Sequence, residues 1–563
     1  MDSWLYDETK PFIHIEAGDT FDELKKNARN GYFEKLIKEY LLDNNHKSII
    51  SLVPEYGLEK EKEQKEADKL AEYKSTLTND ELEELVKKTK ELKEYQDTPS
   101  SQEDLEKIPM LELSDIKREP AKDYNDVKSV DGIKIVHHNI FTNKIAYINM
   151  SFDTKCVPDE LIPYMGLLGS TLSLMDTKNY TYPELTNEIN INCGGLATGT
   201  ALYSDKVDFS KNTIVYEVKS KALYEKVPFV LGMMEEIMYN TRFDDYKRLK
   251  EIIARIKSRL EASLMGQGHS IAMLECCAQF SESAYYSDIL RGYKYYEFIK
   301  KLDEEFEQNK TQIVDKLNKL VGYIFNKDNV IVSLTADDEG YDCFVKALSA
   351  KSCNIKDEHY NTAVRSFIPV NVKTGYTSAS QVQYVARCGN FVKDGYKYTG
   401  ALKVLKVIFS YDYLWINVRV KGGAYGCMSG SSRNGDFYMV SYRDPNLEKT
   451  NDIYEGAADY IRNFNVSRRD MVKFIIGTIG EIDAPLTPSA IGSRSFTHYM
   501  CNCTEDMLRK DREEVLDATV ESIRELAPLI ESAVGQNYLC VVGNQKQINE
   551  AADLFDEIKP LIG

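Results

Sequence analysis

The sequence predicts an α+β protein in which two homologous sandwich domains follow a helical hairpin. Three observations predict this fold class. The chain has 563 residues, a stretch near its N-terminus is dominated by Lys and Glu, and one order of strands, helices and glycines occurs twice. Because a single hydrophobic core stops growing near about 250–300 residues, a chain of this length needs at least two cores.

The composition excludes several classes of partner. The chain carries 71 Lys and Arg against 89 Asp and Glu, a net charge of −18, which argues against nucleic acid because that partner requires clustered basic residues. No apolar run approaches the roughly 20 residues that cross a bilayer, and the N-terminus lacks the pattern of a signal peptide. We therefore expect no membrane partner and a cytoplasmic location. The eleven cysteines have irregular spacing, which predicts reduced thiols rather than a structural zinc framework.

Residues 58–95 predict a hairpin of two long, charged helices. Apolar residues recur at helical spacing on both arms. Between the arms, Thr78 and Glu81 have the spacing of a capping box, so Thr78 is expected to cap the second helix. Pro99 and Pro109 end the stretch. A disordered charged linker is the alternative, but the persistent apolar stripe disfavours it.

The rest of the chain contains one set of elements twice. The first copy has a strand at 144–152, a helix at 161–175, a glycine pair at 194–195, a strand at 213–218 and a late helix from 243 past 259. The second copy has a strand at 381–388, a helix at 396–413, a glycine pair at 422–423, a strand at 437–442, a helix at 453–464 and another from 467. Corresponding features lie about 224 to 237 positions apart, which indicates duplicated domains rather than a solenoid. Each copy predicts helices on one side of a largely antiparallel sheet.

The seven histidines form no recognisable metal motif. Neither H-E-x-x-H nor its inverse H-x-x-E-H occurs, and these spacings place two imidazoles on one helix face. His137 and His138 are expected just before a strand, where neighbouring side chains point to opposite faces. We therefore expect no metal site in this chain. The motifs of serine hydrolases and of nucleotide-binding phosphate loops are also absent from the sequence.

The segment 419–426 (RVKGGAYG) is the strongest candidate for a functional site. Its glycines would allow the backbone to approach a ligand closely. Arg419 offers forked donors to a carbonyl or carboxylate, and the Tyr425 hydroxyl could donate to a developing oxyanion. The alternative is a glycine-rich hairpin with a surface Arg and a packing Tyr. Further on, residues 441–446 (SYRDPN) are typical of a turn that leads from a strand into a helix.

These segments, the duplicated unit and the opening Ser3-Trp4-Leu5-Tyr6 resemble the insulinase-type metallopeptidases with the inverted zinc motif, in the presequence protease and falcilysin branch. The resemblance covers only the C-terminal half of such enzymes. It implies sandwich domains of the insulinase and LuxS type, which pair with an N-terminal half to enclose a chamber that digests peptides. In the family, that N-terminal half binds zinc through the two His of H-x-x-E-H and a distant Glu. The Glu inside the motif acts as general base.

The sequence departs from the full family pattern at one helix. The stretch that would hold the motif, residues 164–172, reads YMGLLGSTL and contains no His and no Glu. The resemblance therefore implies a zinc-free half that is inactive alone. It also implies that Arg419 and Tyr425 reach the substrate beside the zinc. Tyr425 would stabilise the oxyanion, Arg419 would orient the peptide, and the backbone of Gly422, Gly423 and Ala424 would line the substrate site.

The expected organisation is a helical hinge at 1–125, a non-catalytic domain at 126–355 and a domain carrying the Arg and Tyr pair at 356–563. The expected partners are the N-terminal zinc-binding half and short unfolded peptides, with zinc in the complete enzyme only. The start of the chain resembles the mid-chain hinge of the family, so we expect it to be a fragment. A separate inactive subunit with a zinc-bearing partner is one alternative. A peptide-binding or assembly protein is the other, although a scaffold would not need an oxyanion donor.

Overall fold

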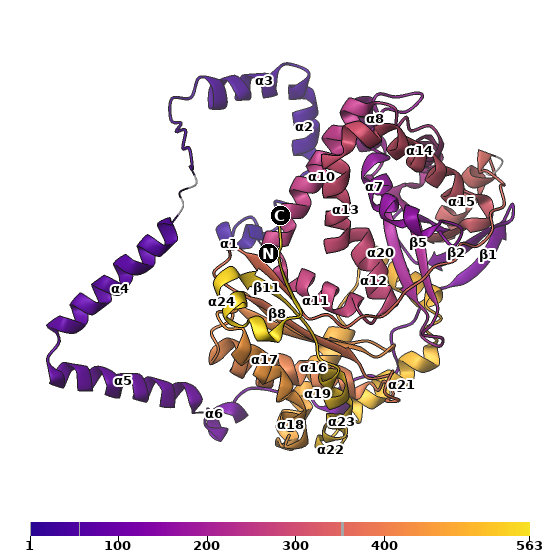
Figure 1. Cartoon of the computed structure of the whole chain (residues 1–563). Coiled ribbons are helices and arrows are strands. Elements are labelled where there is room, and N and C mark those ends of the chain that lie inside the picture. The colour runs from indigo at the N-terminus through magenta and orange to yellow at the C-terminus, as the bar shows by residue number, and fades with distance from the viewer. Residues whose placement is uncertain (1, 54, 56, 99, 351–353, 563) are drawn as a thin grey trace. The chain divides into compact units, whose positions relative to one another are not determined.

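The computed structural model describes residues 2–53, 55, 57–98, 100–350 and 354–562. The chain divides into two compact units, Met1–Pro109 and Met110–Gly563, and each is described by itself. Figure 1 shows their helices and strands along the chain. Among the helices of the described residues, none combines the length and the apolar character that crossing a bilayer requires.

The N-terminal unit is helical. Its elements are α1 (Asp2–Tyr6), α2 (Gly18–Ala28), α3 (Tyr32–Leu36), the π-helical turn η1 (Ile37–Leu42), α4 (Leu58–Thr76), α5 (Asn79–Asp97) and α6 (Gln102–Glu106). The predicted capping box between α4 and α5 is confirmed. The Glu81 N–H donates to Thr78 Oγ1 at 3.3 Å, and the Thr78 N–H donates to Glu81 Oε2 at 2.8 Å. Thr78 therefore caps the start of α5, directly after Leu77 has ended α4. Of the two expected terminators, Pro99 lies outside the described residues.

The second unit contains two six-stranded sheets. The first sheet comprises β1 (Asp126–Val130), β2 (Ile133–Asn139), β3 (Ile145–Asp153), β4 (Leu196–Ser204), β5 (Asn212–Leu223) and β6 (Val330–Ala336). The second comprises β7 (Thr374–Ser378), β8 (Tyr384–Asn390), β9 (Gly426–Ser431), β10 (Asp436–Tyr442), β11 (Tyr538–Asn544) and β12 (Glu557–Pro560).

The two sheets share one topology. Their orders are β1-β2-β6-β3-β5-β4 and β12-β7-β11-β8-β10-β9. In both, the second and third strands of the order are parallel, and the following pairs are antiparallel. Only the first strand of each order differs, because β1 pairs antiparallel with β2 whereas β12 pairs parallel with β7. The predicted α+β class and the duplication are thus confirmed.

Helices pack on both sheets. Those that follow β3 are α7 (Ile162–Thr171), α8 (Tyr182–Asn192), α9 (Val227–Tyr239), α10 (Tyr246–Gly266), α11 (Gly268–Ala278), α12 (Glu282–Arg291), α13 (Tyr293–Glu304), α14 (Phe306–Ile324) and α15 (Asp338–Ser349). Those that follow β8 are α16 (Ala401–Ile408), the π-helical η7 (Phe409–Tyr413) and η8 (Trp415–Val420), α17 (Glu448–Glu455), α18 (Ala457–Arg462), α19 (Arg468–Ile482), α20 (Pro488–Met500), α21 (Glu505–Leu516), α22 (Val520–Arg524), α23 (Ala527–Gly535) and α24 (Gln545–Glu550). Short 3₁₀ turns are η2 (Leu113–Asp115), η3 (Asp159–Leu161), η4 (Tyr224–Lys226), η5 (Lys327–Asn329) and η9 (Ala552–Leu554).

Some predicted boundaries were wrong. The helix expected at 161–175 ends at Thr171 as α7, and the helix expected at 453–464 is divided at Gly456 into α17 and α18. His137 and His138 lie inside β2 rather than before a strand, and both are buried. Burial lowers the pKa of His138 to about 4, so this imidazole is a neutral core group at physiological pH.

Each sandwich domain covers the other domain's sheet with one helix. Helix α11 packs on β8, β10 and β11 of the second sheet, and α20 packs on β2 and β6 of the first. Gly268 of α11 lies against Tyr384, and Gly492 of α20 lies against Thr335. The exchange is reciprocal, because each sandwich domain contributes one helix to the sheet of the other.

Candidate functional site

The sequence-predicted Arg419 and Tyr425 lie on either side of one turn at the edge of the second sheet. Helix α16 continues through the π-helical segments η7 and η8, and Arg419 occupies the last turn of η8. Residues 421–424 reverse the chain, and Tyr425 leads directly into the edge strand β9. Wide π-helical turns recur at functional sites in proteins. The helix prediction ended at 413, so it missed the segment that holds Arg419.

The glycine-rich turn is fixed by its own backbone. The Gly423 N–H donates to the Arg419 carbonyl at 2.8 Å, and the Ala424 N–H donates to the Val418 carbonyl at 3.1 Å. A Cβ on Gly422 would lie 2.4 Å from the Val418 oxygen, and Gly423 has a φ of +84°. Both glycines are therefore required by the fold of the turn. Contact of this backbone with a substrate stays a prediction.

The two candidate side chains are presented with free donors. The Arg419 guanidinium stacks on Trp415 at 3.9 Å and lies 6.0 Å from the centre of the Tyr425 ring. The Tyr425 side chain is 67% exposed. Among the described residues, none hydrogen-bonds the Tyr425 hydroxyl or the Arg419 guanidinium. Stacking orients the guanidinium without using its N–H groups, so both side chains can donate to an incoming ligand.

The segment 441–446 supports this turn. Asn446 donates through Nδ2 to the Gly422 carbonyl at 2.6 Å, and the Arg443 carbonyl accepts the Tyr425 N–H at 3.2 Å. Asp444 is buried and accepts hydrogen bonds from Thr450 and from the Asn446 N–H, while burial raises the pKa of its carboxyl. The predicted turn into a helix is confirmed, and it also anchors the candidate site.

Aromatic rings continue the site toward α11. Tyr442 lies 5.8 Å from Tyr425 between ring centres, and it packs edge-on against His269 at 4.8 Å. Burial lowers the pKa of His269. Sequence reasoning missed Trp415, Tyr442 and His269. The four-residue spacing of Trp415 and Arg419 on one helix was the available signal for the stacked pair.

Helix α7, where the sequence resemblance places the expected zinc motif, is packed directly onto a strand. Helix α7 contains no His, Cys, Asp or Glu. A Cβ on Gly169 would lie 3.4 Å from the Gly199 Cα, and Thr198 Oγ1 donates to the Gly169 carbonyl at 2.8 Å. The donor set here does not fit a zinc ion, since carbonyl and hydroxyl groups replace the imidazoles and carboxylates that zinc prefers.

Within the described part of the chain, one trio of possible metal ligands gathers: Asp328, Asp357 and His359. All three are exposed, and His359 Nδ1 lies 2.5 Å from Asp328 Oδ2. Asp328 lies in η5, Asp357 and His359 lie between α15 and β7, and no residue of the Arg419 turn is part of the trio. It is distinct from the site that the sequence predicts.

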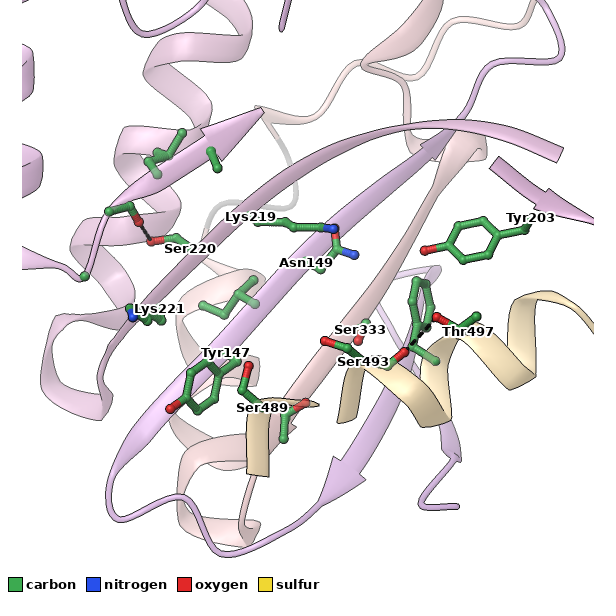
Figure 2. Close-up of a pocket in the computed structure, with 17 residues that line it drawn as sticks. Tyr147, Asn149, Tyr203, Lys219, Ser220, Lys221, Ser333, Ser489, Ser493 and Thr497 are labelled. Carbon is green, nitrogen blue, oxygen red and sulfur yellow. Dashed lines mark hydrogen bonds between the residues drawn. The ribbon is translucent and has the colours of Figure 1, made fainter. Parts of the chain in front are cut away.

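A polar cavity of about 400 Å³ lies on the first sheet beside α20, away from the predicted residues. In Figure 2, Lys219 and Asn149 of the sheet point toward each other, and Ser489, Ser493 and Thr497 lie along the helix. The buried Glu217 carboxylate is 2.5 Å from Lys219 Nζ and accepts from Asn149 at 2.8 Å. The glycine pair Gly194–Gly195 lines this cavity. The sequence analysis noted this pair but did not predict a cavity from it.

The comparisons with known proteins agree with this architecture. Residues 52–302 match a family described as associated with peptidases of the M16 group, subfamily C, and residues 375–544 match the "PreP C-terminal domain". The chain is 39% identical to Protein HypA of Clostridium perfringens, over all of this chain and 58% of that protein. It is 29% identical to presequence protease 1 of Arabidopsis thaliana, over all of this chain and 53% of that protein. The chain thus spans about half the length of these curated relatives.

Solved structures share the fold. The peptidase M16 inactive domain from Pseudomonas fluorescens superposes with a TM-score of 0.51 at 15% identity and covers 77% of this chain and 98% of its own. A protease from Helicobacter pylori gives a TM-score of 0.52 at 13% identity, with 75% of this chain and 99% of its own covered. Through these two family models and its presequence protease relatives, the chain matches the C-terminal half of the presequence proteases, which are insulinase-type M16 peptidases.

Proposed function

We propose that this chain is the zinc-free, substrate-clamping half of a zinc metalloendopeptidase that degrades short unstructured peptides in a closed chamber. The names of its relatives support a peptidase, and the chain's match to about half of each relative supports a second half that carries the zinc. That half and unfolded peptides are the proposed partners. Alone, the chain would cleave no peptide. We also keep the boundaries 1–125, 126–355 and 356–563 and the cytoplasmic location as proposals.

The proposed chemistry assigns separate roles to the two exposed donors. Zinc in the other half would activate a water for attack on the peptide carbonyl. The Tyr425 hydroxyl would donate to the oxygen of the scissile carbonyl as it becomes an oxyanion. Arg419, held flat on Trp415, would donate its forked N–H groups to a neighbouring peptide carbonyl and so fix the position of the substrate.

One observation carries the proposal. Arg419 and Tyr425 share a turn that is hydrogen-bonded internally and anchored by Asn446, and their donors have no partner among the described residues. A turn held this rigidly loses little freedom when it binds, which suits groups that stabilise a transition state. A purely packing role would leave the Tyr425 ring buried rather than exposed.

Replacing the Tyr425 hydroxyl tests the proposal. In an enzyme completed by fusing the unmatched segment of the Clostridium perfringens relative to this chain, Tyr425→Phe should lower kcat by about 10²–10³ while KM changes little. Tyr411→Phe is the matched control, because Tyr411 is another exposed tyrosine, on η7 of the same helical segment. Equal kcat for both variants would remove the proposed role of Tyr425.

A further inference from the structure

The second sheet has a free edge with a groove along it. β9 is the last strand of the sheet and pairs only with β10. A cavity of about 740 Å³ lies between this strand, α16 of the same domain and α10, α11 and α12 of the first domain. Tyr425 immediately precedes β9, and Ser429, Gly430 and Ser431 at the other end of this strand line the groove.

The groove is lined from both faces of β9. Ser429 is paired with the fully buried Met439, so its side chain lies on the face toward the core. Gly430 is paired with Tyr438, whose ring lies on the opposite face and closely covers Gly430. Ser429, Gly430 and Tyr438 all line the same cavity. Since side chains alternate across a strand, a cavity that touches both faces must lie along the strand's edge.

The backbone of this edge is unpaired. At the hairpin end, the Ser432 N–H donates to the Asp436 carbonyl at 2.9 Å. Because hydrogen-bonded pairs alternate along an antiparallel ladder, the N–H and C=O groups of Ser431 and Ser429 point away from β10. No other described residue hydrogen-bonds these groups.

A buried hydroxyl also lacks a partner in the groove. Ser429 is only 3% exposed, and its Oγ has no hydrogen-bond partner among the described residues. A buried hydroxyl without a partner is costly, and a ligand that supplies the missing hydrogen bond removes that cost. The hydroxyl therefore points to an occupant independently of the strand edge.

The charges around the groove favour an acidic occupant. Arg291, Lys403 and Lys406 line it. The two lysines are paired with Asp511 and Glu481 respectively, whereas Arg291 forms no ion pair with a described residue. The acidic group of the lining, Asp436, is already hydrogen-bonded by Ser281 at 2.6 Å and Asn390 at 2.8 Å. The available charge at the groove is therefore positive.

We propose that an extended peptide with an acidic side chain binds in this groove as an added strand beside β9, with its acidic group against Arg291. Backbone hydrogen bonds from Ser429 and Ser431 would hold the peptide, as in other cases of strand addition. The free edge of the six-residue β9 is about 20 Å long, and its last three residues line the groove, so a short extended segment can pair there. The inference rests on the proposed function in one respect: the peptide in the groove would be a substrate of the peptidase, held at Tyr425 and continuing along this edge.

Peptide binding to the full chain tests the groove without any cleavage. The probe is a fluorescein-labelled peptide of alternating Thr and Val with one central Glu, measured by fluorescence anisotropy. Ser431→Pro removes an outward N–H without removing a bond to β10, and it should weaken binding about three- to tenfold. Ser431→Ala is the matched control, because it removes the hydroxyl and keeps the N–H, so its affinity should stay within about twofold. Arg291→Gln should weaken binding of the Glu peptide more than that of the same peptide with Gln.

Methylation of the probe's own backbone nitrogens gives a second measurement that needs no variant protein. In strand addition, every second residue of the peptide directs its N–H toward β9. N-methylation of those residues should abolish binding, whereas N-methylation of the residues between them should be tolerated. Equal sensitivity to methylation of either set, or no binding by the unmodified peptide, would overturn the inference. Loss of the Tyr425 effect on cleavage with groove binding intact would instead overturn the proposed function and leave the groove standing.

Discussion

Gly422 shows how single atoms determine the shape of the candidate site. The turn brings its Cα close to the Val418 carbonyl, and the carbonyl of Gly422 itself accepts from Asn446. Arg419 and Tyr425 are exposed on either side of this contact. The turn is therefore as sensitive to an added methyl group as a packed core would be.

Gly422→Ala is expected to destabilise the protein by about 1–3 kcal/mol, because the new Cβ would meet the Val418 oxygen and the turn would have to shift. Thermal or denaturant unfolding measures the change. Gly480→Ala is the control: Gly480 lies in α19 with open space around its Cα, and an added methyl there should stabilise the helix by about 0.5–1 kcal/mol. A neutral Gly422→Ala would show that the turn is not as tight as described.

The sequence indicated the residues of this candidate site but not their arrangement. Arg419 and Tyr425 could be singled out because the glycines between them indicated a turn. The stacking of Arg419 on Trp415 and the anchoring by Asn446 depend on a π-helix and on a hairpin about 24 positions away. Neither contact follows from local periodicity, because tertiary packing selects both.

Among the elements, α11 and α20 hold the two sandwich domains together. Each helix lies on the sheet of the other domain, and a glycine of each helix lies against a side chain of that sheet. An apolar cluster that includes Cys276 and Phe280 from α11 and its neighbouring turn, together with Tyr384 and Cys388 from the second sheet, fills one of these contacts.

Gly492→Ala should therefore destabilise the protein by about 1–3 kcal/mol, because a Cβ would lie 1.8 Å from Thr335 Oγ1 and would push α20 off the first sheet. Unfolding curves monitored by circular dichroism give the value. Gly232→Ala in α9, where the same Cβ would meet no atom within 4 Å, should not destabilise. If both variants had the same stability, α20 would not be closely packed on that sheet.

A buried carboxyl on α11 makes this contact sensitive to pH. Glu275 accepts from Tyr376 of the second sheet at 3.0 Å, and Asp288, fully buried, lies nearby with Lys294 at 3.4 Å. Burial, followed by the charge of Asp288, raises the pKa of Glu275 from 4.5 to about 8. The folded state thus holds the proton that the unfolded state releases above its lower pKa.

The free energy of unfolding should consequently fall as the pH rises from about 5 to 8, by up to about 1.4 kcal/mol per pH unit from this group. Glu275→Gln keeps an acceptor for Tyr376 and removes the ionisation, so it should flatten this dependence and raise stability at pH 8. Denaturant unfolding at several pH values measures it. An unchanged pH slope in the variant would show that Glu275 ionises normally.

Element boundaries were predicted well where a capping residue marked them. Thr78 and Ser467 start their helices as the sequence indicates. The sequence did not predict that His137 and His138 would lie inside β2, since their polarity hides the strand pattern. It also missed that α16 continues as π-helix, because a wider helical turn leaves no signature in a 3.6-residue periodicity.

For the whole molecule, duplication explains the shared fold but not the different chemistry of the two copies. The two sheets have one topology, yet the corresponding positions carry different chemistry. In the first domain, α7 is closed against β4 by glycines, whereas in the second domain α16 leads to a turn with two exposed donors. At this position the first copy is closed by packing, whereas the second presents the two donors that are proposed to contact substrate.

The most direct test of this account measures cleavage of an unstructured fluorogenic peptide by this chain alone and after fusion to the unmatched segment of the Clostridium perfringens relative, which is proposed to carry the zinc. The account predicts no cleavage above buffer by the chain alone and zinc-dependent cleavage by the fusion, because the chain supplies the donors and the other half supplies the metal. Cleavage by the chain alone at the rate of the fusion would contradict it.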